Sequence, residues 1–348
     1  MERIAPLLLD WYARRGRDLP WRRTRDPYRI WLSEVILQQT RVAQGMAYYF
    51  RFTERFPDVR SLAAAGEDEV LKLWQGLGYY SRARNLHAAA RQVMERFGGV
   101  FPRTPEEVRS LRGVGEYTAA AVCSAAFDAP CAVVDGNVYR VLARLFDLAV
   151  PIDTTEGKRA FAELARLQLD EKRPGLYNQA IMDFGALQCT TAQPDCAGCP
   201  LAEQCLARAA GTASERPVKQ GRTRVRDRWF NYLHITCGGK TLLRRREERD
   251  IWQGLYEFPL IETDRAADYA VCAHTPLFRE LCGDSARLVR SVAMPRHQLS
   301  HQTIHAVFHR IETPQLSPAA EALAVDTASV GEYAVPRLID RYLIKYQM

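Results

Sequence analysis

The sequence lacks any apolar run approaching twenty residues, so no stretch has the length of an ordinary membrane-spanning helix. Its first residues mix Glu2, Arg3 and Asp10 with a short apolar patch, which is unlike the layout of a secretory signal peptide. These absences predict a soluble, intracellular protein that is cytoplasmic and has no membrane partner. The 348 residues are enough for two domains, each with a substantial core.

The sequence also has little excess charge of either sign, because 48 Lys and Arg stand against 41 Asp and Glu, for a net charge of +7. This modest basic bias is compatible with a nucleic-acid partner and does not require one. Arginine and tryptophan concentrate in the first thirty residues, where a solvated surface is the default and phosphate contact the alternative. Cysteine occurs nine times, and in an intracellular protein this favours metal ligands or buried thiols over disulfides.

Two short helices joined by a glycine turn are predicted between residues 104 and 122. Thr104 can cap the first helix and close a capping box with the acid three residues later. Gly113 and Gly115, two residues apart, favour a tight turn with positive φ and uncovered backbone amides. The second helix restarts at Glu116, and amides at such a start can bind an anion such as phosphate. An ordinary helix-turn-helix corner is the alternative.

An acid follows this turn at the start of a further helix. Asp135 and Gly136 directly precede an apolar-periodic helix from Val138, so the simplest role for Asp135 is an N-cap. A carboxylate there feels the positive helix end and tends to remain ionised, which suits an anion that faces developing positive charge. The hairpin at 111–119 followed by this Asp resembles the helix-hairpin-helix DNA glycosylases.

Glu34 lies in an apolar helix predicted over residues 30–40. Hydrophobic neighbours should raise its pKa and keep a proton on it, whereas a lone Glu in a helix is more often solvated or paired. The stretch is similar to the adenine glycosylase subfamily, the MutY type, whose general acid occupies the position of Glu34. Gln39 matches the residue that such enzymes push into the duplex beside the lesion.

The resemblance implies further contacts with double-stranded DNA. Tyr79, exposed by a glycine turn, matches the aromatic wedge next to the damaged base, with core packing as the alternative. Ser300 and His301 match the family's Phe-Ser-His loop, whereas Leu299 departs from it and can wedge but not stack like Phe. The predicted DNA contacts are Gln39, Tyr79, Arg82, Leu111, Gly113, Val114, Gly115, Leu299, Ser300 and His301.

Four cysteines with the spacing C-x6-C-x2-C-x5-C form a candidate metal site: Cys189, Cys196, Cys199 and Cys205. Four thiolates so close in sequence could hold a structural zinc ion. The spacing is also the one by which the resembled glycosylases hold a four-iron four-sulfur cluster, so one 4Fe-4S cluster is the implied cofactor. We expect it to act as a structural staple in the loop at 189–205, near DNA.

Beyond the cysteines the pattern changes. Residues 207–228 lose periodicity and gain Gly, Ser, Pro and basic side chains, which is typical of a linker. Residues 229–235, 240–243 and 304–311 alternate apolar and polar as half-buried strands do. The stretch 249–259 resembles the Trp-x-Gly-Leu-x-x-Phe-Pro element of the Nudix-like domain in adenine glycosylases. The sequence has no Nudix glutamate box, so lesion recognition is implied and not hydrolysis.

The predicted architecture is multi-domain α+β. An all-α helix-hairpin-helix glycosylase domain, with the iron-sulfur cluster loop, covers 1–206, a basic linker covers 207–228, and a Nudix-like α/β domain covers 229–348. Helices of the first domain are predicted over 64–73, 82–97, 138–146, 156–169 and 176–187.

The implied activity is hydrolytic removal, by a monomer, of adenine mispaired with 8-oxoguanine or guanine in DNA. Glu34 would protonate N7 of the flipped adenine, and Asp135 would stabilise the oxocarbenium-like sugar. Tyr117 and Asn137 match residues that line the sugar and support the Asp.

Two other functions share part of this pattern. An endonuclease III-like glycosylase with lyase activity needs a lysine nucleophile after the hairpin, where this chain has Tyr117. Base removal without efficient strand cleavage is therefore predicted. A DNA-binding protein with a structural or redox cluster would share the hairpin and the cysteines. It would not require Glu34 in an apolar helix or Asp135 beside the hairpin.

Overall fold

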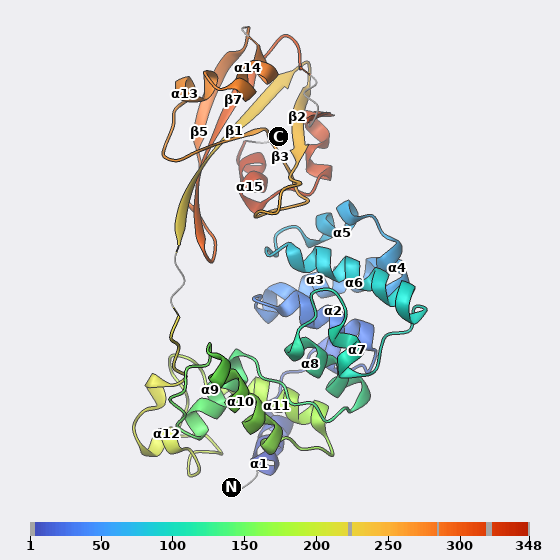
Figure 1. Ribbon diagram of the computed structural model, residues 1–348, viewed down its shortest axis with the longest axis vertical. Coiled ribbons are helices and arrows are strands. Elements are labelled where there is room, and N and C mark those ends of the chain that lie inside the picture. Colours follow the sequence, from blue (N-terminus) through green and yellow to red (C-terminus); the bar gives the residue numbers. More distant parts are fainter. Residues whose placement is uncertain (1–3, 222–224, 284, 318–321, 347–348) are drawn as a thin grey trace. The chain divides into compact units, whose positions relative to one another are not determined.

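The chain is arranged in two compact units (Figure 1). The computed structural model describes residues 4–221, 225–283, 285–317 and 322–346. Unit 1 is formed by residues 1–64 and 85–221 and is built from helices. Unit 2 is formed by residues 65–84 and 222–348 and holds the β-sheet. One unit built from helices and a second unit that holds a sheet together confirm the predicted α+β class.

Unit 1 consists of short and medium helices joined by tight turns. Its elements are α1 (Ala5–Arg15), η1 (Pro20–Arg22), α2 (Pro27–Leu37), α3 (Val42–Arg55), α4 (Val59–Ala64), most of α6 (Ser81–Phe97), α7 (Pro105–Arg109), α8 (Glu116–Phe127), α9 (Gly136–Leu145), α10 (Thr155–Gln168), α11 (Pro174–Leu187), α12 (Leu206–Ala209) and η2 (Ala213–Glu215).

The hairpin between α7 and α8 forms as its residues predict. The Thr104 hydroxyl accepts a hydrogen bond from the Glu107 amide (3.3 Å), and the Glu107 carboxylate accepts one from the Thr104 amide (3.3 Å), which completes the capping box. Gly113 has φ +74°, a value that favours glycine. Gly115 does not need positive φ, contrary to our expectation, because it is the N-cap of α8 with φ −97°.

Close approach of α9 and α11 brings the second half of unit 1 together. Figure 1 shows both helices beside α10, and their apolar faces share one core with α1, which includes Leu8, Val138, Phe161 and Phe184. Gly185 of α11 lies against the backbone of Asn137 in α9. A Cβ added at Gly185 would lie 2.9 Å from the Asn137 carbonyl oxygen. The glycine therefore sets the spacing of the two helices.

Unit 2 contains an eight-stranded mixed sheet around the long central strand β1 (Arg226–Cys237). β1 pairs in parallel with β7 (Gln302–Glu312) and antiparallel with β2 (Lys240–Arg245) and β4 (Leu260–Thr263). β7 also pairs with β5 (Arg287–Ala293) and β6 (His297–Gln298), and β2 with β3 (Tyr256–Glu257) and β8 (Ala322–Asp326). The helical elements are α5 (Glu67–Trp74), α13 (Tyr269–Ala273), α14 (Pro276–Cys282), η3 (Thr327–Glu332) and α15 (Arg337–Lys345).

Side-chain alternation along β1 builds a core on each face of this sheet. Phe230 and Tyr232 pack with residues of α15, whereas Leu233 and Ile235 pack with residues of α13 and α14. Alternating residues of a strand point to opposite faces, so helices cover both sides. This layered arrangement confirms that the C-terminal domain is α/β, and the three predicted strands lie within β1, β2 and β7.

The boundaries of some elements differ from the predicted ones. The helix predicted over 64–73 is divided, because Gly66 is the N-cap of α5 and separates it from α4. β1 begins at Arg226, inside the segment predicted as a linker, and residues 222–224 of that segment lie outside the described part of the chain. Within the described ranges, no helix combines the length and apolar character needed to cross a membrane.

Gly185→Ala should lower the free energy of unfolding by about 1 to 3 kcal/mol, because the new methyl group overpacks the α9–α11 contact. Urea denaturation followed by circular dichroism measures the change. Gly136→Ala is the matched control, since a Cβ at that helical position meets no atom within 4 Å. Equal stability of the two variants would contradict the close-packing argument.

Candidate active site

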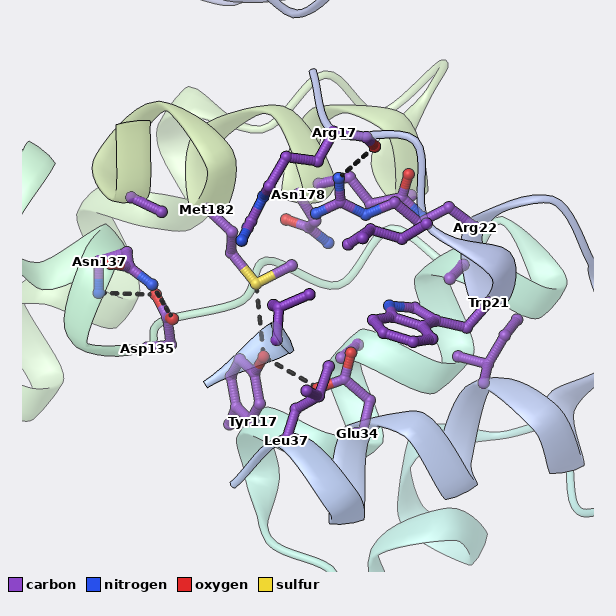
Figure 2. A pocket seen from close by; sticks show the side chains of 18 of the residues that line it. Arg17, Trp21, Arg22, Glu34, Leu37, Tyr117, Asp135, Asn137, Asn178 and Met182 are labelled. Atoms are coloured by element: carbon purple, nitrogen blue, oxygen red, sulfur yellow. Dashed lines mark hydrogen bonds between the residues drawn. The ribbon is translucent and has the colours of Figure 1, made fainter. Parts of the chain in front are cut away.

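A cavity of about 510 Å³ lies in unit 1 among α2, α8, α9 and α11 (Figure 2). Its volume falls in the range of small-molecule sites. The lining combines a tryptophan, three arginines and two acids with amide and apolar side chains. The lining residues include Arg17, Trp21, Arg22, Glu34, Tyr117, Asp135, Asn137, Asn178, Gln179 and Met182. All four predicted catalytic residues therefore line one cavity.

Glu34 reaches this cavity from α2, a helix that is buried on most sides. Its neighbours Leu32, Val35 and Ile36 are buried, so the carboxyl group lies among protein atoms although it lines the cavity. Burial raises the pKa of Glu34 to about 7. A hydrogen bond from Tyr117 opposes this rise, and the nearby charge of Asp135 adds to it. The predicted direction of the shift is confirmed.

Tyr117 lies in the first turn of α8, which packs against α2. Its hydroxyl donates to Glu34 Oε2 (3.0 Å) and lies 3.3 Å from the sulfur of Met182. Burial raises the pKa of Tyr117 well above its ordinary value, so the phenol keeps its proton. With Oε2 engaged as an acceptor, a proton on the carboxyl group of Glu34 belongs on Oε1.

Asp135 is the N-cap of α9, as predicted. Its Oδ1 accepts hydrogen bonds from the amides of Asn137 (2.9 Å) and Val138 (2.8 Å), and its Oδ2 accepts one from the Asn137 side chain (2.8 Å). Burial nevertheless raises the pKa of Asp135, and these hydrogen bonds oppose the rise without reversing it. The rise differs in direction from the effect expected of the positive helix end, because desolvation of the Asp135 carboxylate outweighs it.

Arg140 orients the side-chain amide of Asn137, which in turn donates a hydrogen bond to Asp135. Its guanidinium donates to Asn137 Oδ1 (2.8 Å), which leaves the Asn137 amide nitrogen directed at Asp135. The same guanidinium donates to the carbonyl oxygens of Gly185 (2.5 Å) and Cys189 (2.8 Å). The orientation of Asp135 thus depends on the packing of α9 against the C-terminal end of α11.

Asp183 is a functional candidate that the sequence analysis missed. Its side chain is fully buried on α11, and both of its oxygens accept hydrogen bonds from Arg22 (2.7 and 2.8 Å). Arg17 donates to the same carboxylate (2.9 Å). The arginines among the first thirty residues are predicted to form a solvated surface or to contact phosphate. For Arg17 and Arg22 this prediction is wrong, because both side chains pair with buried Asp183. An acid in the otherwise apolar run Ile181–Phe184 was the available signal.

Two predicted DNA-contact residues have a backbone conformation that is uncommon outside glycine. Gln39 has φ +54° and Tyr79 has φ +47°. Such residues are strained by roughly 1 to 3 kcal/mol and cluster at functional sites. Gln39 is exposed and follows the end of α2 at Leu37, so the helix predicted over 30–40 ends three residues earlier than expected.

The remaining predicted DNA contacts fall into two groups. Leu111 and Val114 are buried, so the hairpin offers the exposed backbone around Gly113 and Gly115 and not these side chains. In unit 2, Ser300 and His301 are exposed, and half-buried Leu299 packs against the core under the sheet. Arg82 is only 8% exposed and donates to the carbonyl of Gly78 (3.2 Å). Its side chain supports the Tyr79 turn from within.

The four candidate cysteines are half-buried thiols in the loop between α11 and α12. Buried Arg144 donates to the sulfur of Cys189 (3.4 Å), and the thiol of Cys205 donates to the Arg144 carbonyl (3.4 Å). Burial raises the pKa of Cys199 to about 11, and the charges of the other three cysteines add to this rise. Four mutually close thiols beside a buried cation fit the donor set of a thiolate-bound cluster.

Comparison with known families identifies the class. The model of the "HhH-GPD superfamily base excision DNA repair protein" matches residues 32–166, which include Glu34, the hairpin and Asp135. The model of the "NUDIX domain" matches residues 231–345. Fold and cavity therefore define a helix-hairpin-helix base excision repair protein with a Nudix domain.

Sequence identity to individual proteins shows which family within this class the chain resembles. The adenine DNA glycosylase of Buchnera aphidicola subsp. Schizaphis graminum is 33% identical over 261 residues, which cover 75% of each chain. The mouse adenine DNA glycosylase is 46% identical over 209 residues, which cover 58% of this chain and 41% of the mouse protein. The chain belongs to the adenine DNA glycosylase family, as the resemblance predicted. It matches about four-tenths of the length of the mouse relative.

A solved structure shares the fold of part of the chain. The structure of a thermostable thymine-DNA glycosylase is 30% identical and superposes with a TM-score of 0.56. The match covers 60% of this chain and 95% of that one.

The pKa of Glu34 predicts how stability depends on pH. The folded-state pKa of about 7 exceeds the ordinary value of 4.5, so the folded protein holds a proton that the unfolded chain releases between these values. Stability therefore falls as pH rises from about 4.5 to about 7. Glu34→Gln should be more stable than wild type at pH 8, on the order of 2 kcal/mol, and gain little at pH 4.5.

Urea unfolding at both pH values measures this difference. Glu163→Gln, which changes an exposed acid on α10, is the control and should show no such pH dependence. A gain in stability for Glu34→Gln that is the same at both pH values would contradict a burial-shifted carboxyl group.

Proposed function

We propose that this protein hydrolyses the N-glycosidic bond of adenine mispaired with 8-oxoguanine or guanine in double-stranded DNA. The observation that carries the proposal is the pair of acids in one cavity: Glu34, whose pKa of about 7 lets it hold a proton, and Asp135, whose carboxylate is hydrogen-bonded at both oxygens. Membership of the family and the names of its relatives support the choice of adenine.

Glu34 acts as the general acid. The adenine must leave the base stack to reach a protein cavity, and enzymes of this kind flip the nucleotide out. An acid with a pKa of about 7 is substantially protonated at neutral pH and still acidic enough to donate. Because Tyr117 donates to Oε2, the proton on Oε1 is available to N7 of adenine, which makes the base a better leaving group.

Asp135 acts at the sugar. Positive charge grows on the sugar as the bond to the base breaks, and a carboxylate at that point stabilises it electrostatically. Two backbone amides and the Asn137 side chain hold the Asp135 carboxylate in one orientation, so little reorganisation is needed when the charge develops. Water then adds to the sugar and completes the hydrolysis.

We assign one four-iron four-sulfur cluster to Cys189, Cys196, Cys199 and Cys205. The C-x6-C-x2-C-x5-C spacing of these cysteines is the one by which the resembled glycosylases hold such a cluster, and this spacing supports a cluster over a zinc ion. When bound, the cluster would serve as a structural staple beside the Arg140 and Arg144 contacts.

Double-stranded DNA is the partner of a monomeric protein. The amides around Gly113 and Gly115 at the start of α8 suit a backbone phosphate. Gln39 and Tyr79 are exposed and can enter the duplex, while Ser300 and His301 offer polar groups to the base opposite the adenine. Leu299 can fill space beside that base but cannot stack on it as an aromatic ring would.

Base release tests the proposed chemistry. Duplexes with adenine opposite 8-oxoguanine or guanine should lose adenine, and normal adenine-thymine pairs should not. Glu34→Gln and Asp135→Asn should each slow release by about 100-fold or more, because each removes a group that acts in the transition state. Single-turnover assays with alkali development measure the rates, and wild-type rates should fall as pH rises through about 7.

DNA binding by gel shift is the control for both variants and should persist. No adenine release by the wild-type protein from any mispair would instead favour a protein that only binds DNA.

Strand cleavage tests whether the enzyme is monofunctional. A lyase needs an amine nucleophile, and no lysine is among the described residues that line the cavity, where Tyr117 keeps its phenol proton. Products should therefore remain uncut until alkali is added, and borohydride should trap no protein-DNA adduct. Substantial cleavage without alkali, or a trapped adduct, would refute this mechanism.

A further inference from the structure

Residues Ala65–Arg84 cluster with the C-terminal part of the chain, although both ends of this segment continue into unit 1. The segment contains α5 and the turn at residues 75–80, called here the Tyr79 loop. Several polar side chains attach it to the sheet domain of unit 2. The attachment matters because the loop carries a candidate DNA wedge.

Lys72 makes the central contact. Its ammonium donates to the carbonyl oxygens of Tyr333 (3.0 Å) and Gly331 and to the Gln75 side chain (3.2 Å). An ammonium group has three donors, and here each of them has an acceptor. Lys72 is half-buried and its contacts with Gln75 and Tyr333 are partly buried, so these charge-assisted hydrogen bonds should be stronger than a surface ion pair.

Gln75 extends the attachment to the base of the Tyr79 loop, because it is both the C-cap of α5 and the first residue of that loop. Its amide nitrogen donates to Asp340 of α15 (3.2 Å), and its carbonyl oxygen accepts from the Val335 amide (3.3 Å). The loop therefore begins at Gln75, whose side-chain nitrogen and side-chain oxygen are both hydrogen-bonded to the C-terminal domain.

The other end of α5 is held by charges. Arg245 of β2 pairs with Glu67 (2.7 Å) and Asp68 (3.2 Å), and the Tyr256 hydroxyl donates to Asp68 (3.0 Å). These groups are partly exposed, so each pair contributes little by itself. The hydrogen bonds of Lys72 and Gln75 should therefore contribute most to the attachment.

The Tyr79 loop is also closed internally. The Trp74 indole (3.1 Å) and the Arg82 guanidinium (3.2 Å) both donate to the carbonyl of Gly78. Tyr79 follows with positive φ, its side chain is 48% exposed, and its hydroxyl is hydrogen-bonded to the Ser300 side chain. The loop thus presents Tyr79 and Ser300 as neighbours on one rigid support.

We propose that Lys72 and Gln75 are positioning residues that make the Tyr79 loop part of the C-terminal domain, so that Tyr79 and Ser300 meet the base opposite adenine together. The proposal rests on the proposed function. 8-Oxoguanine differs from guanine by one oxygen at C8 and one hydrogen at N7. Discrimination by so few atoms needs a polar group held at hydrogen-bond distance while the neighbouring ring separates the bases.

Lys72→Met in the full chain tests the proposal, with Lys158→Met on exposed α10 as the matched control. Hydrogen exchange without DNA should become faster in residues 75–84 and 333–340 for Lys72→Met and stay unchanged for the control. The ratio of adenine-release rates opposite 8-oxoguanine and opposite guanine should fall about tenfold, the size expected for losing hydrogen bonds to a charged group. Lys72→Arg should restore part of this ratio.

The two readouts separate the possible outcomes. Unchanged exchange would show that Lys72 does not hold the loop, and faster exchange with an unchanged ratio would show that the attachment does not serve discrimination. Either result overturns the proposal while leaving adenine release intact. A wild-type protein that releases no adenine from either duplex would instead refute the proposed function. If Lys72→Met does not fold, Gln75→Leu is tested by the same two measurements.

Discussion

Protein atoms surround the carboxyl group of Glu34 where water would otherwise solvate it, and the rest of the cavity follows from this desolvation. The charged form of the acid is disfavoured, so its pKa rises to about 7 and a proton is available near neutral pH. The same burial destabilises the folded protein once the proton is lost. The packing of α2 against α8 must therefore be strong enough to keep the desolvated carboxyl group of Glu34 in place. The same packing brings the Tyr117 hydroxyl to Oε2 of Glu34, which leaves Oε1 free to donate a proton.

Asp135, the second acid in the same cavity, is held by a different set of hydrogen bonds. Asp135 is also desolvated, but two backbone amides and the Asn137 side chain favour its carboxylate, whereas Glu34 accepts from the Tyr117 hydroxyl. This support depends on how closely α9 and α11 approach, because Arg140 spans the two helices and Gly185 sets their spacing. Hydrogen bonding, and not opposite pKa shifts, thus distinguishes the two acids.

In unit 2, too, hydrogen bonds hold a candidate functional side chain, here Tyr79, in one position. Gly78 permits a sharp turn, and the turn is then fixed by donors from Trp74 and Arg82, so that strain at Tyr79 is maintained by its surroundings. In the function that we propose, a Tyr79 side chain held this way does not need to be ordered at the moment of DNA binding, which reduces the entropy lost on association. The loop at Ser300 reaches the same place from the edge of the sheet, after β6.

The sequence by itself determined those features that depend on a few neighbouring residues. The Thr104 capping box, the Asp135 N-cap, the alternation along β1 and the upward pKa shift of Glu34 all follow from local patterns. Only the tertiary structure decided what distant residues do together. Arg17 meets Asp183 across 166 positions, Lys72 meets Tyr333 across 261, and Tyr79 meets Ser300 across 221. It also raised the pKa of Asp135, because the burial of this N-cap depends on how α9 packs against other helices, whereas the apolar residues around Glu34 are its neighbours in sequence.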